Sequence, residues 1–477
     1  MSTKMSAKLS WDNLLNKKRQ RESISDTMTH RNEFDKDYDR IIYSSSLRRL
    51  QDKAQVFPLQ ENDFTRTRLT HSMEVASLGR SMAWNIGTWL LEEKKFKHFW
   101  EVKELASLVE VSCLVHDLGN PPFGHYGEDI IRNWFVKWFK SSAFNEIEDS
   151  YISKGFSPLN TQQKNDFRYF EGNAQAIRIL TKLQFLNDQH GANFTYGTLA
   201  TLMKYPWASD HEKAIKKEKF GYFYSEKQLY EDLHKEVGIG ERRHPATYLL
   251  EAADDIAYLT ADVEDGVKKG IVKWEEEYEK ISNYLEEHYV SDYARLKKYR
   301  DQANENKVPN KNLVNVQNFK VAAQGIMIKA VIEVFKSRYD DIMSGTFEGG
   351  LLEASTARDL EKILKGISRE YCYSDNEVIT LELVGDRVIS DLLDLFVDAV
   401  VNIDTKPKTR LKKEKLFHLI SENFRHIQSL DSDGLPNIKF EELSLYNRLI
   451  LITDFISGMT DSYAVSLHQK LLGVKLP

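Results

Sequence analysis

Cysteine is scarce in this chain, since Cys113 and Cys372 are the only two among 477 residues. Two cysteines are too few for a disulfide scaffold or a thiolate zinc cluster, and their near absence suits a reducing cytoplasm. The sequence also lacks an apolar run long enough to span a bilayer, and its first residues lack the apolar core of a signal peptide. We therefore expect a cytoplasmic protein that makes no membrane contact.

Neither sign of charge is in strong excess. The formal net charge is −6 and the pI is near 6.2, so the overall charge gives no argument for binding nucleic acid or an acidic membrane. The apolar fraction of 41% is typical of a globular protein. A chain of 477 residues exceeds the size at which a single core usually stops growing. Two lobes or one large helical unit are both compatible with this length.

Proline is sparse, with 10 residues, and alternating strand patterns are few. Both features favour a mostly α fold with few short strands. Apolar residues at helical spacing are found in 71–91, 105–119, 244–270, 321–339, 387–401 and 446–472. The best strand candidates are AQVFPL at 54–59 and EVITLELVG at 377–385.

Two of the expected helices have ionisable side chains on faces that otherwise belong to the core. His71 lies one turn before Val75 on the inward stripe of its helix. The adjacent pair His116 and Asp117 ends the next helix, where Gly119 is a natural C-cap. Neighbouring side chains diverge by about 100° on a regular helix. Both can therefore ligate one ion only where the helix terminates.

A third helix adds the neighbouring carboxylates Asp254 and Asp255. A buried imidazole or carboxylate is unfavourable unless it is paired or bound to a metal. Two imidazoles and two carboxylates are suitable ligands for a divalent ion such as Mn²⁺, Co²⁺, Ni²⁺, Fe²⁺ or Zn²⁺. Hydrogen-bonded core histidines are the simpler alternative for each of these positions taken singly.

The stretch GNPPFGHYGE places His125 and Glu128 three residues apart, just beyond the His-Asp pair. On a helix these two positions share a face. A histidine held by a carboxylate is the usual general acid or base near neutral pH. The prolines and glycines would fold the chain back over the ion and bring His125 towards it. A surface loop with incidental polar residues is the alternative.

Longer segments make the pattern recognisable. They are RRLQDKAQVFPLQENDFTRTRLTHSMEV, CLVHDLGNPPFGHYGE, FEGNAQAIRIL, YLLEAADDIAYLTADVEDGV and DFISGMTDSYA. With the order H…HD…D, they resemble the bacterial deoxyguanosine triphosphate triphosphohydrolases, which are HD-domain metal-dependent phosphohydrolases. The resemblance runs from about residue 40 to the C-terminus. It implies a mostly helical protein, usually a hexamer, that uses Mn²⁺, Mg²⁺ or Co²⁺ to cleave dGTP into deoxyguanosine and inorganic triphosphate.

The resemblance also suggests how the chain is organised. We expect an N-terminal arm at 1–40 and an HD-domain core with the metal and catalytic groups at 41–300. The polar tract 301–315 is expected to be a loop or linker. A C-terminal helical region at 316–477 would complete the nucleotide pocket and make the oligomer contacts.

The family pattern assigns roles to particular residues. The implied metal ligands are His71, His116, Asp117 and Asp254, and the implied catalytic pair is His125 and Glu128. Asp254 is chosen over Asp255 because the family uses the first of the two.

The implied sugar site shares a helix with Asp254. Asp254, Tyr258 and Asp262 are spaced at i, i+4 and i+8, on one helical face. In the family, Asp262 and Gln55 would hydrogen-bond the 3′-OH of the sugar. Tyr258 would lie against C2′ and leave no room for a ribose hydroxyl. Without the flanking aspartates, a core aromatic would be the default interpretation of Tyr258.

The triphosphate requires cations and amide donors. The residues that match family positions near the phosphates are Arg68, Asn173, Lys204, Tyr205 and Lys219. Base recognition is expected from the C-terminal half, with Glu382 a candidate for the guanine edge. Asp386 departs from the uncharged or aromatic residue expected at its position, which puts the local base contacts in doubt.

Two kinds of alternative remain open. Enzymes of the same fold include broad-specificity dNTP triphosphohydrolases, phosphodiesterases and guanosine-tetraphosphate hydrolases. A nucleotide- or DNA-binding regulator is a different class, which the complete set of catalytic residues disfavours. Family members can respond to single-stranded DNA, and the basic pieces NKKRQR and KTRLKKEK could contact it. Exposed charge runs are more often only solvated faces.

Overall fold

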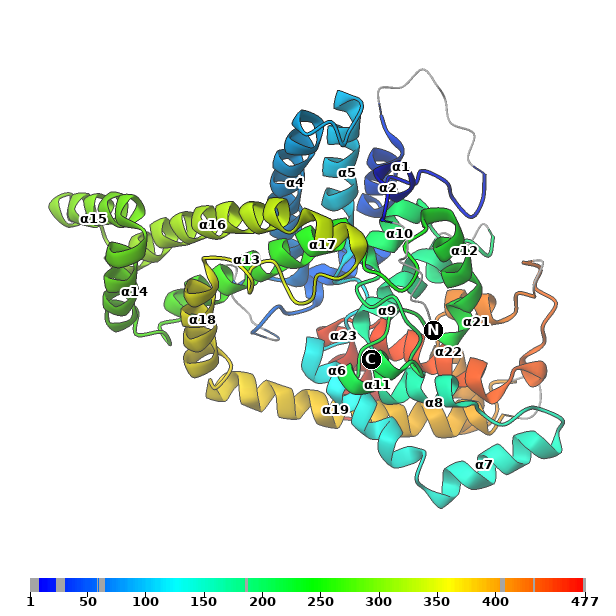
Figure 1. The fold of residues 1–477 in the computed structure, drawn as a ribbon. Coiled ribbons are helices and arrows are strands. Elements are labelled where there is room, and N and C mark those ends of the chain that lie inside the picture. The colour runs from blue at the N-terminus through cyan, green and yellow to red at the C-terminus, as the bar shows by residue number, and fades with distance from the viewer. Residues whose placement is uncertain are drawn as a thin grey trace.

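The structure is a computed structural model (Figure 1). It describes residues 8–22, 31–57, 59, 65–184, 188–403, 408–431 and 434–474. The mostly α fold expected from the sequence is confirmed. Within the described residues, β-structure is limited to isolated bridges, which join Arg19 to Thr195, Ala54 to Thr67 and Ala208 to Tyr222.

The described residues form helices along the whole chain. The first half of the chain contains α1 (Trp11–Leu14), α2 (Glu33–Ile42), α3 (Ser45–Arg49), α4 (Arg68–Glu92), α5 (Phe99–Val115), α6 (Gly124–Trp138), α7 (Ser142–Ser153), α8 (Thr161–Arg168), α9 (Gly172–Arg178), α10 (Tyr196–Leu202), α11 (Glu212–Lys217) and α12 (Lys227–Val237). The second half contains α13 (Pro245–Lys268), α14 (Trp274–His288), α15 (Val290–Glu305), α16 (Lys311–Ser337), α17 (Tyr339–Ser344), α18 (Arg358–Ile367), α19 (Asn376–Val401), α20 (Lys412–Leu419), α21 (Glu422–Gln428), α22 (Leu445–Ser457) and α23 (Asp461–Leu471). Short 3₁₀ segments span Leu50–Asp52, Tyr224–Glu226 and Phe440–Glu442, and π-helical turns span Ile179–Leu183 and Ser368–Cys372.

Three long helices form the part of the core that positions the site. α4 packs along α5, and α13 packs against both of them and against α16 (Figure 1). Val75, Met82 and Ile86 of α4 are fully buried, as their spacing predicts. Truncating Met82 or Ile86 to alanine would lower the free energy of unfolding by about 2–5 kcal/mol, because the cavity left behind relaxes only partly. Packing in the core therefore fixes the positions of the side chains that these helices direct into the site.

Local sequence fixes where these helices begin. Thr67 caps α4, and its side chain and that of Thr70 each accept the other residue's backbone N–H. α13 begins with Pro245, and the His244 side chain accepts the N–H of Ala246. These caps set the register of the two helices that supply His71 and Asp254.

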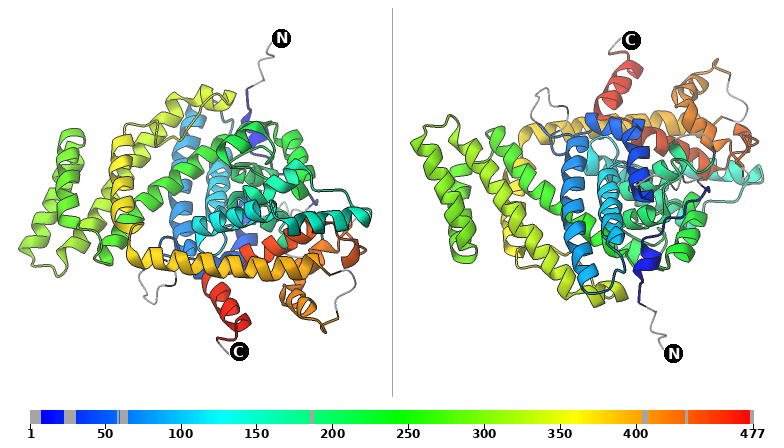
Figure 2. Two further views of the ribbon diagram at one scale, coloured as in Figure 1. Left: turned by 90° about the horizontal axis from the view of Figure 1, so that it is seen from below. Right: turned by 90° about the horizontal axis from the view of Figure 1, so that it is seen from above.

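The C-terminal region closes over the same core. α19 packs against α6, α22 and α23. Two further views show α19 as a long helix across one side of the molecule, while α14 and α15 lie at its edge (Figure 2). No described helix is both long and apolar enough to cross a membrane.

The expected strand at 377–385 is wrong, because this segment lies inside α19. Its buried positions, Val378 and Gly385, continue into Val388, Ile389 and Leu392 at helical spacing. The helical spacing of buried residues along the whole of α19 outweighs the strand preference of the few β-branched residues within 377–385. In the other candidate, 54–59, Ala54 forms only one isolated bridge, and residue 58 lies outside the described residues.

The expected loop at 301–315 is mostly helical. α15 continues to Glu305 and α16 begins at Lys311, so the break is confined to 306–310. In the N-terminal arm, Trp11, Leu14 and Phe34 are buried in the core. α2 packs against α5. The described part of the arm is therefore packed against the core.

Candidate active site

Four ionisable side chains from α4, the end of α5 and α13 meet at one point. His71 Nε2 lies 3.0 Å from Asp254 Oδ1. His116 Nε2 lies 3.5 Å from the same oxygen and 3.5 Å from Asp117 Oδ1. His71, His116 and Asp117 are buried, and each offers one ligand atom within 4.8 Å of the others. The convergence expected from the sequence is present.

The orientation of His116 suits a metal ligand. α5 ends at Val115, so His116 is its C-cap and the chain turns immediately afterwards. His116 Nδ1 lies 2.7 Å from the carbonyl oxygen of Cys113 and donates its proton to it, so the neutral form of the ring, the form that binds a metal, has its lone pair on Nε2. That Nε2 is buried and has no hydrogen-bond partner among the described residues. An unpaired imidazole nitrogen facing two carboxylates fits a divalent ion.

Two side chains hold Asp117 from behind. Arg68 Nη1 donates to Asp117 Oδ2 at 2.8 Å, and Asn120 Nδ2 donates to Oδ1. The Arg68 guanidinium lies against Gly124, where a Cβ would come within 2.2 Å of Nη2. Gly124 also has φ +60°, which favours glycine. Gly124 of the segment GNPPFGHYGE therefore leaves space for Arg68, which orients the Asp117 carboxylate.

His125 and Glu128 form a pair at the start of α6. His125 Nδ1 lies 3.1 Å from Glu128 Oε2, and Glu128 Oε1 accepts the N–H of Gly172 at 2.7 Å. The hydrogen bond and the charge of Glu128 raise the pKa of His125. Burial opposes ionisation of Glu128, but the hydrogen bond and charge of His125, helped by Lys219, lower the pKa of that carboxyl to about 2. The His125 side chain is 77% exposed, so the imidazole faces an accessible space.

That space is a cavity of about 460 Å³. Of the site residues expected from the sequence, it is lined by Gln55, Arg68, Asp117, His125, Lys204, Asp254, Tyr258 and Asp262. Glu382 lines it as well. Two carboxylates of the cluster, the His125 side chain and one face of α13 therefore open into one pocket, whereas His71, His116 and Glu128 are not among the residues that line it.

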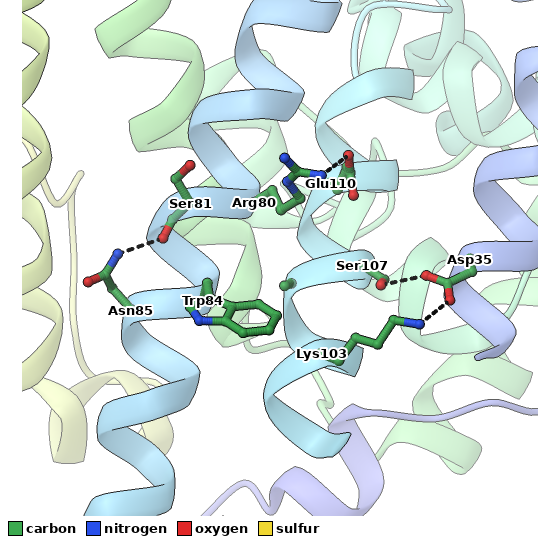
Figure 3. A pocket seen from close by; sticks show the side chains of 9 residues that line it. Asp35, Arg80, Ser81, Trp84, Asn85, Lys103, Ser107 and Glu110 are labelled. Carbon is green, nitrogen blue, oxygen red and sulfur yellow. Dashed lines mark hydrogen bonds and ion pairs between the residues drawn. The ribbon is translucent and has the colours of Figure 1, made fainter. Parts of the chain in front are cut away.

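A second cavity, of about 520 Å³, lies beside α4 and α5 (Figure 3). Its cations are paired with carboxylates, Arg80 with Glu110 at 3.5 Å and Lys103 with Asp35 at 2.9 Å. None of the expected site residues lines it. Although it is the larger of the two, it lacks the chemistry of the first.

The face of α13 supplies one wall of the first pocket. Asp254, Tyr258 and Asp262 all line the cavity, so the predicted i, i+4, i+8 face is confirmed. Tyr373 donates its hydroxyl proton to Asp262 Oδ2 at 2.7 Å. Burial raises the pKa of Asp262 to about 7 despite that bond. Gln55 Oε1 is buried, with no hydrogen-bond partner in the described part of the chain.

Comparison with known proteins gives a consistent family. The HD domain family model matches residues 68–157, the segment that contains His71, His116, Asp117, His125 and Glu128. A deoxyguanosinetriphosphate triphosphohydrolase-like protein of Listeria innocua is 41% identical, and the match covers 98% of this chain and 100% of that protein. A protein of the same description from Synechocystis is 32% identical over 98% of this chain and all of its own length. The deoxyguanosinetriphosphate triphosphohydrolase of Serratia proteamaculans is 33% identical over 93% of this chain and 94% of its own.

This chain belongs to the deoxyguanosinetriphosphate triphosphohydrolase (dGTPase) family. The HD model ends before α13, so it does not include Asp254. The geometry of this dGTPase-family chain adds that carboxylate to the cluster. The HD domain and the family assignment support a metal-dependent hydrolase.

Two of the expected phosphate contacts line this pocket. Lys204 Nζ lies 3.1 Å from Glu251, which also pairs with Arg243. Arg68 reaches the pocket while holding Asp117. Both cations are therefore positioned by carboxylates and still face the cavity.

The other three expected phosphate contacts, Asn173, Tyr205 and Lys219, are not among the residues that line the cavity. Asn173 and Lys219 both bind Glu171, through Nδ2 and Nζ respectively, each at 2.6 Å. Lys219 Nζ also lies 3.9 Å from Glu128. In this structure Glu171 holds both residues, and neither lines the cavity. Tyr205 lies beside Lys204, whose Nζ is 5.8 Å from the ring centre.

The cavity is also lined by residues outside the set of site residues that we expected from the sequence. The further lining residues are Ala54, Val56, Phe123, Tyr126, Asp255, Tyr373 and Val378. Tyr373 has the clearest role, because it contacts Asp262. No motif marks it in the sequence, since it follows the irregular π-helical turn Ser368–Cys372. Asp386, the departure noted in the sequence, is not among the lining residues.

Proposed function

We propose that this protein hydrolyses dGTP to deoxyguanosine and inorganic triphosphate. The observation that supports this best is the single face of α13 on which Asp254 joins the metal cluster while Tyr258 and Asp262 face the same pocket. Groups suited to phosphate chemistry and a wall suited to a sugar thus lie side by side. A deoxynucleoside triphosphate needs both.

The metal would bring Lewis-acid chemistry to the α-phosphate. A divalent ion, Mn²⁺, Mg²⁺ or Co²⁺, would be held by His71, His116, Asp117 and Asp254. Arg68 and Lys204 would neutralise the oxygens of the triphosphate. Asn173, Tyr205 and Lys219 remain predicted phosphate contacts on the strength of the family pattern.

His125 would donate a proton to the leaving 5′-oxygen. Its ring is open to the pocket, and its hydrogen bond to Glu128 favours the protonated form. A donor protonated near neutral pH suits an alkoxide-like leaving group, which would otherwise depart as a strong base. Glu128 would stay ionised and hold the imidazole in place.

The sugar would rest on the α13 wall. Gln55 and Asp262 would hydrogen-bond the 3′-OH, with Tyr373 fixing one oxygen of Asp262. Tyr258 would pack against C2′ and leave a ribose hydroxyl without space or a partner. The site would therefore select deoxyribose.

Glu382 would read the base. Its side chain lines the same pocket, from the α19 wall. An ionised carboxylate only accepts hydrogen bonds. Guanine offers two adjacent donors, N1–H and N2–H, whereas adenine and cytosine offer one amino group and thymine one imide N–H. A carboxylate at this position therefore favours guanine.

Product analysis tests these assignments. Purified protein with Mn²⁺ or Mg²⁺ is given dGTP, dATP, dCTP, dTTP and GTP in turn. Deoxyguanosine with intact triphosphate from dGTP alone is expected. Comparable release from several dNTPs would favour the broad-specificity alternative, and dGMP with pyrophosphate would refute the reaction.

A pair of α19 variants tests the base reader. Glu382→Gln replaces one acceptor with a donor and should lower the preference for dGTP over dATP by at least about tenfold, because a buried donor of the base is left unpaired. Asp386→Asn, one turn further along α19 and outside the cavity lining, is the matched control. An unchanged base preference in Glu382→Gln would remove Glu382 from base recognition.

One of the two basic segments that could bind single-stranded DNA is used within the chain itself. Basic residues of NKKRQR form ion pairs within the chain: Lys17 with Glu104, Lys18 with Glu236, Arg19 with Asp37 and Arg21 with Asp188. A role of this segment in packing accounts for its charge. Binding of single-stranded DNA, hexamer formation and a cytoplasmic location stay predictions. Oligonucleotide titration at several salt concentrations tests the binding of single-stranded DNA, and light scattering tests the hexamer.

A further inference from the structure

Asp461 joins two walls of the pocket that lie far apart in the sequence. It is the first residue of α23 and is 2% exposed. Its Oδ2 accepts the backbone N–H of Ala54 at 2.9 Å, and its Oδ1 accepts the backbone N–H of Phe123 at 3.0 Å. Ala54 and Phe123 both line the cavity, whereas Asp461 does not. One carboxylate outside the pocket thus holds two of its walls.

Each wall leads directly to a site residue. Ala54 is followed by Gln55, and Phe123 stands two residues before His125. Phe123 has a left-handed backbone, φ 62° and ψ 18°, which a bulky residue keeps only where its surroundings enforce it. The bond to Asp461 fixes its amide. Its ring lies so close to Gly385 that a Cβ there would be 2.7 Å from it.

Lys53 supports the same junction from the other side. Its side chain is buried, and Nζ donates to the carbonyl oxygens of Asn120 and Ser457. Burial lowers the pKa of Lys53 to about 7, and the nearby Asp461 carboxylate opposes that shift. The loop that leads into α6 is therefore tied to the C-terminal helices by the side chains of both Lys53 and Asp461.

We propose that Asp461 is a positioning residue that fixes His125 relative to Gln55. The effect on turnover rests on the proposed function, whereas the effect on the two amides does not. A carboxylate offers two acceptors and no donor, which matches two converging N–H groups. Asparagine has the same shape but would turn its NH₂ group towards one of them.

Amide hydrogen exchange at single-residue resolution tests the contact itself. The amides of Ala54 and Phe123 should be protected in the wild-type protein. In Asp461→Asn they should exchange roughly tenfold faster or more, the scale of losing a charge-assisted hydrogen bond. Ser462→Ala is the matched control, because the Ser462 hydroxyl binds Asp52 at the same helix start. That variant should leave both amides unchanged.

Turnover tests the positioning role. Asp461→Asn should lower kcat by about 10²-fold, since a misplaced catalytic group can lose that much. It should keep the wild-type Mn²⁺-induced rise in Tm, because the ligands are untouched. Asp461→Glu, which keeps both acceptors, should recover part of the activity, and Ser462→Ala should retain all of it.

Several results would overturn the proposal. They are rapid exchange of the Phe123 amide in the wild type, wild-type exchange of both amides in folded Asp461→Asn, and full turnover of that variant. If Asp461→Asn does not fold, two other measurements test the proposal. Protected amides of Ala54 and Phe123 in the wild type and partial turnover of Asp461→Glu would support it, and the absence of either would overturn it. A wild-type protein with protected amides but no action on dGTP would refute the proposed function and leave the contact standing.

Discussion

Replacing His125 separates catalysis from metal binding. His125 faces the pocket and contacts Glu128, but it is not part of the cluster formed by His71, His116 and Asp117. His125→Ala should therefore lower kcat by at least about 10²-fold, the lower end for loss of a general acid or base. That factor corresponds to about 2.7 kcal/mol of transition-state stabilisation.

Metal binding gives the second readout, independent of turnover. A ligand at 100 times its Kd stabilises the folded state by about 2.7 kcal/mol. In a protein of 477 residues, the entropy of unfolding converts that into a rise in Tm of about 3 °C. Wild type and His125→Ala should both show this rise with Mn²⁺, measured by thermal denaturation.

His71→Ala is the matched comparison. It removes a cluster ligand, so it should lose both turnover and the Mn²⁺-dependent rise in Tm. Turnover of His125→Ala within threefold of wild type would remove His125 from the chemistry. Loss of the Mn²⁺ response in His125→Ala would instead make it a metal ligand, contrary to the geometry.

Three other changes probe separate parts of the site. Glu128→Gln removes the group that raises the pKa of His125, so that pKa should fall. Because the proton donor must be protonated, the alkaline limb of the pH profile of kcat should move to lower pH. An unchanged alkaline limb would refute the pairing of His125 with Glu128. Tyr258→Ala should raise the hydrolysis of GTP relative to dGTP, by roughly 10- to 200-fold if the ring acts sterically, as competition assays would show. Gly124→Ala should lower stability by about 1–3 kcal/mol in denaturant titrations, because its φ is +60° and its Cβ would meet Arg68; wild-type stability would contradict the packing described.

The cluster could be anticipated because each ligand stands at a position with a local signature. His71 continues the stripe of α4, and the pair His116 and Asp117 stands where α5 ends. Asp254 and Asp262 share a helical period that is visible in the sequence. Each of these features depends on neighbours within a few residues, which is the range over which periodicity and capping act.

What escaped prediction depends on contacts between distant segments. Tyr373 and Asp262 are 111 positions apart in the sequence, and no local pattern near either residue predicts their contact. Lys219 meets Glu171 in the same way, so its partner could not be read from the charged stretch around it. The strand expected at 377–385 failed because a short window of β-branched residues was weighed without the longer helix that contains it.

The continuous helix α13 acts as a ruler. Its rise of about 1.5 Å per residue separates Asp254 from Asp262 by roughly 12 Å along the axis, whatever the surrounding loops do. In the function proposed above, this spacing would set the span between the reacting phosphate and the far edge of the sugar. A single residue inserted between Tyr258 and Asp262 would turn Asp262 by about 100° away from the cavity. The distance between Asp254 and Asp262 therefore depends on an uninterrupted helix, in which only insertions or deletions close to a whole turn, about three or four residues, keep both side chains on the cavity face.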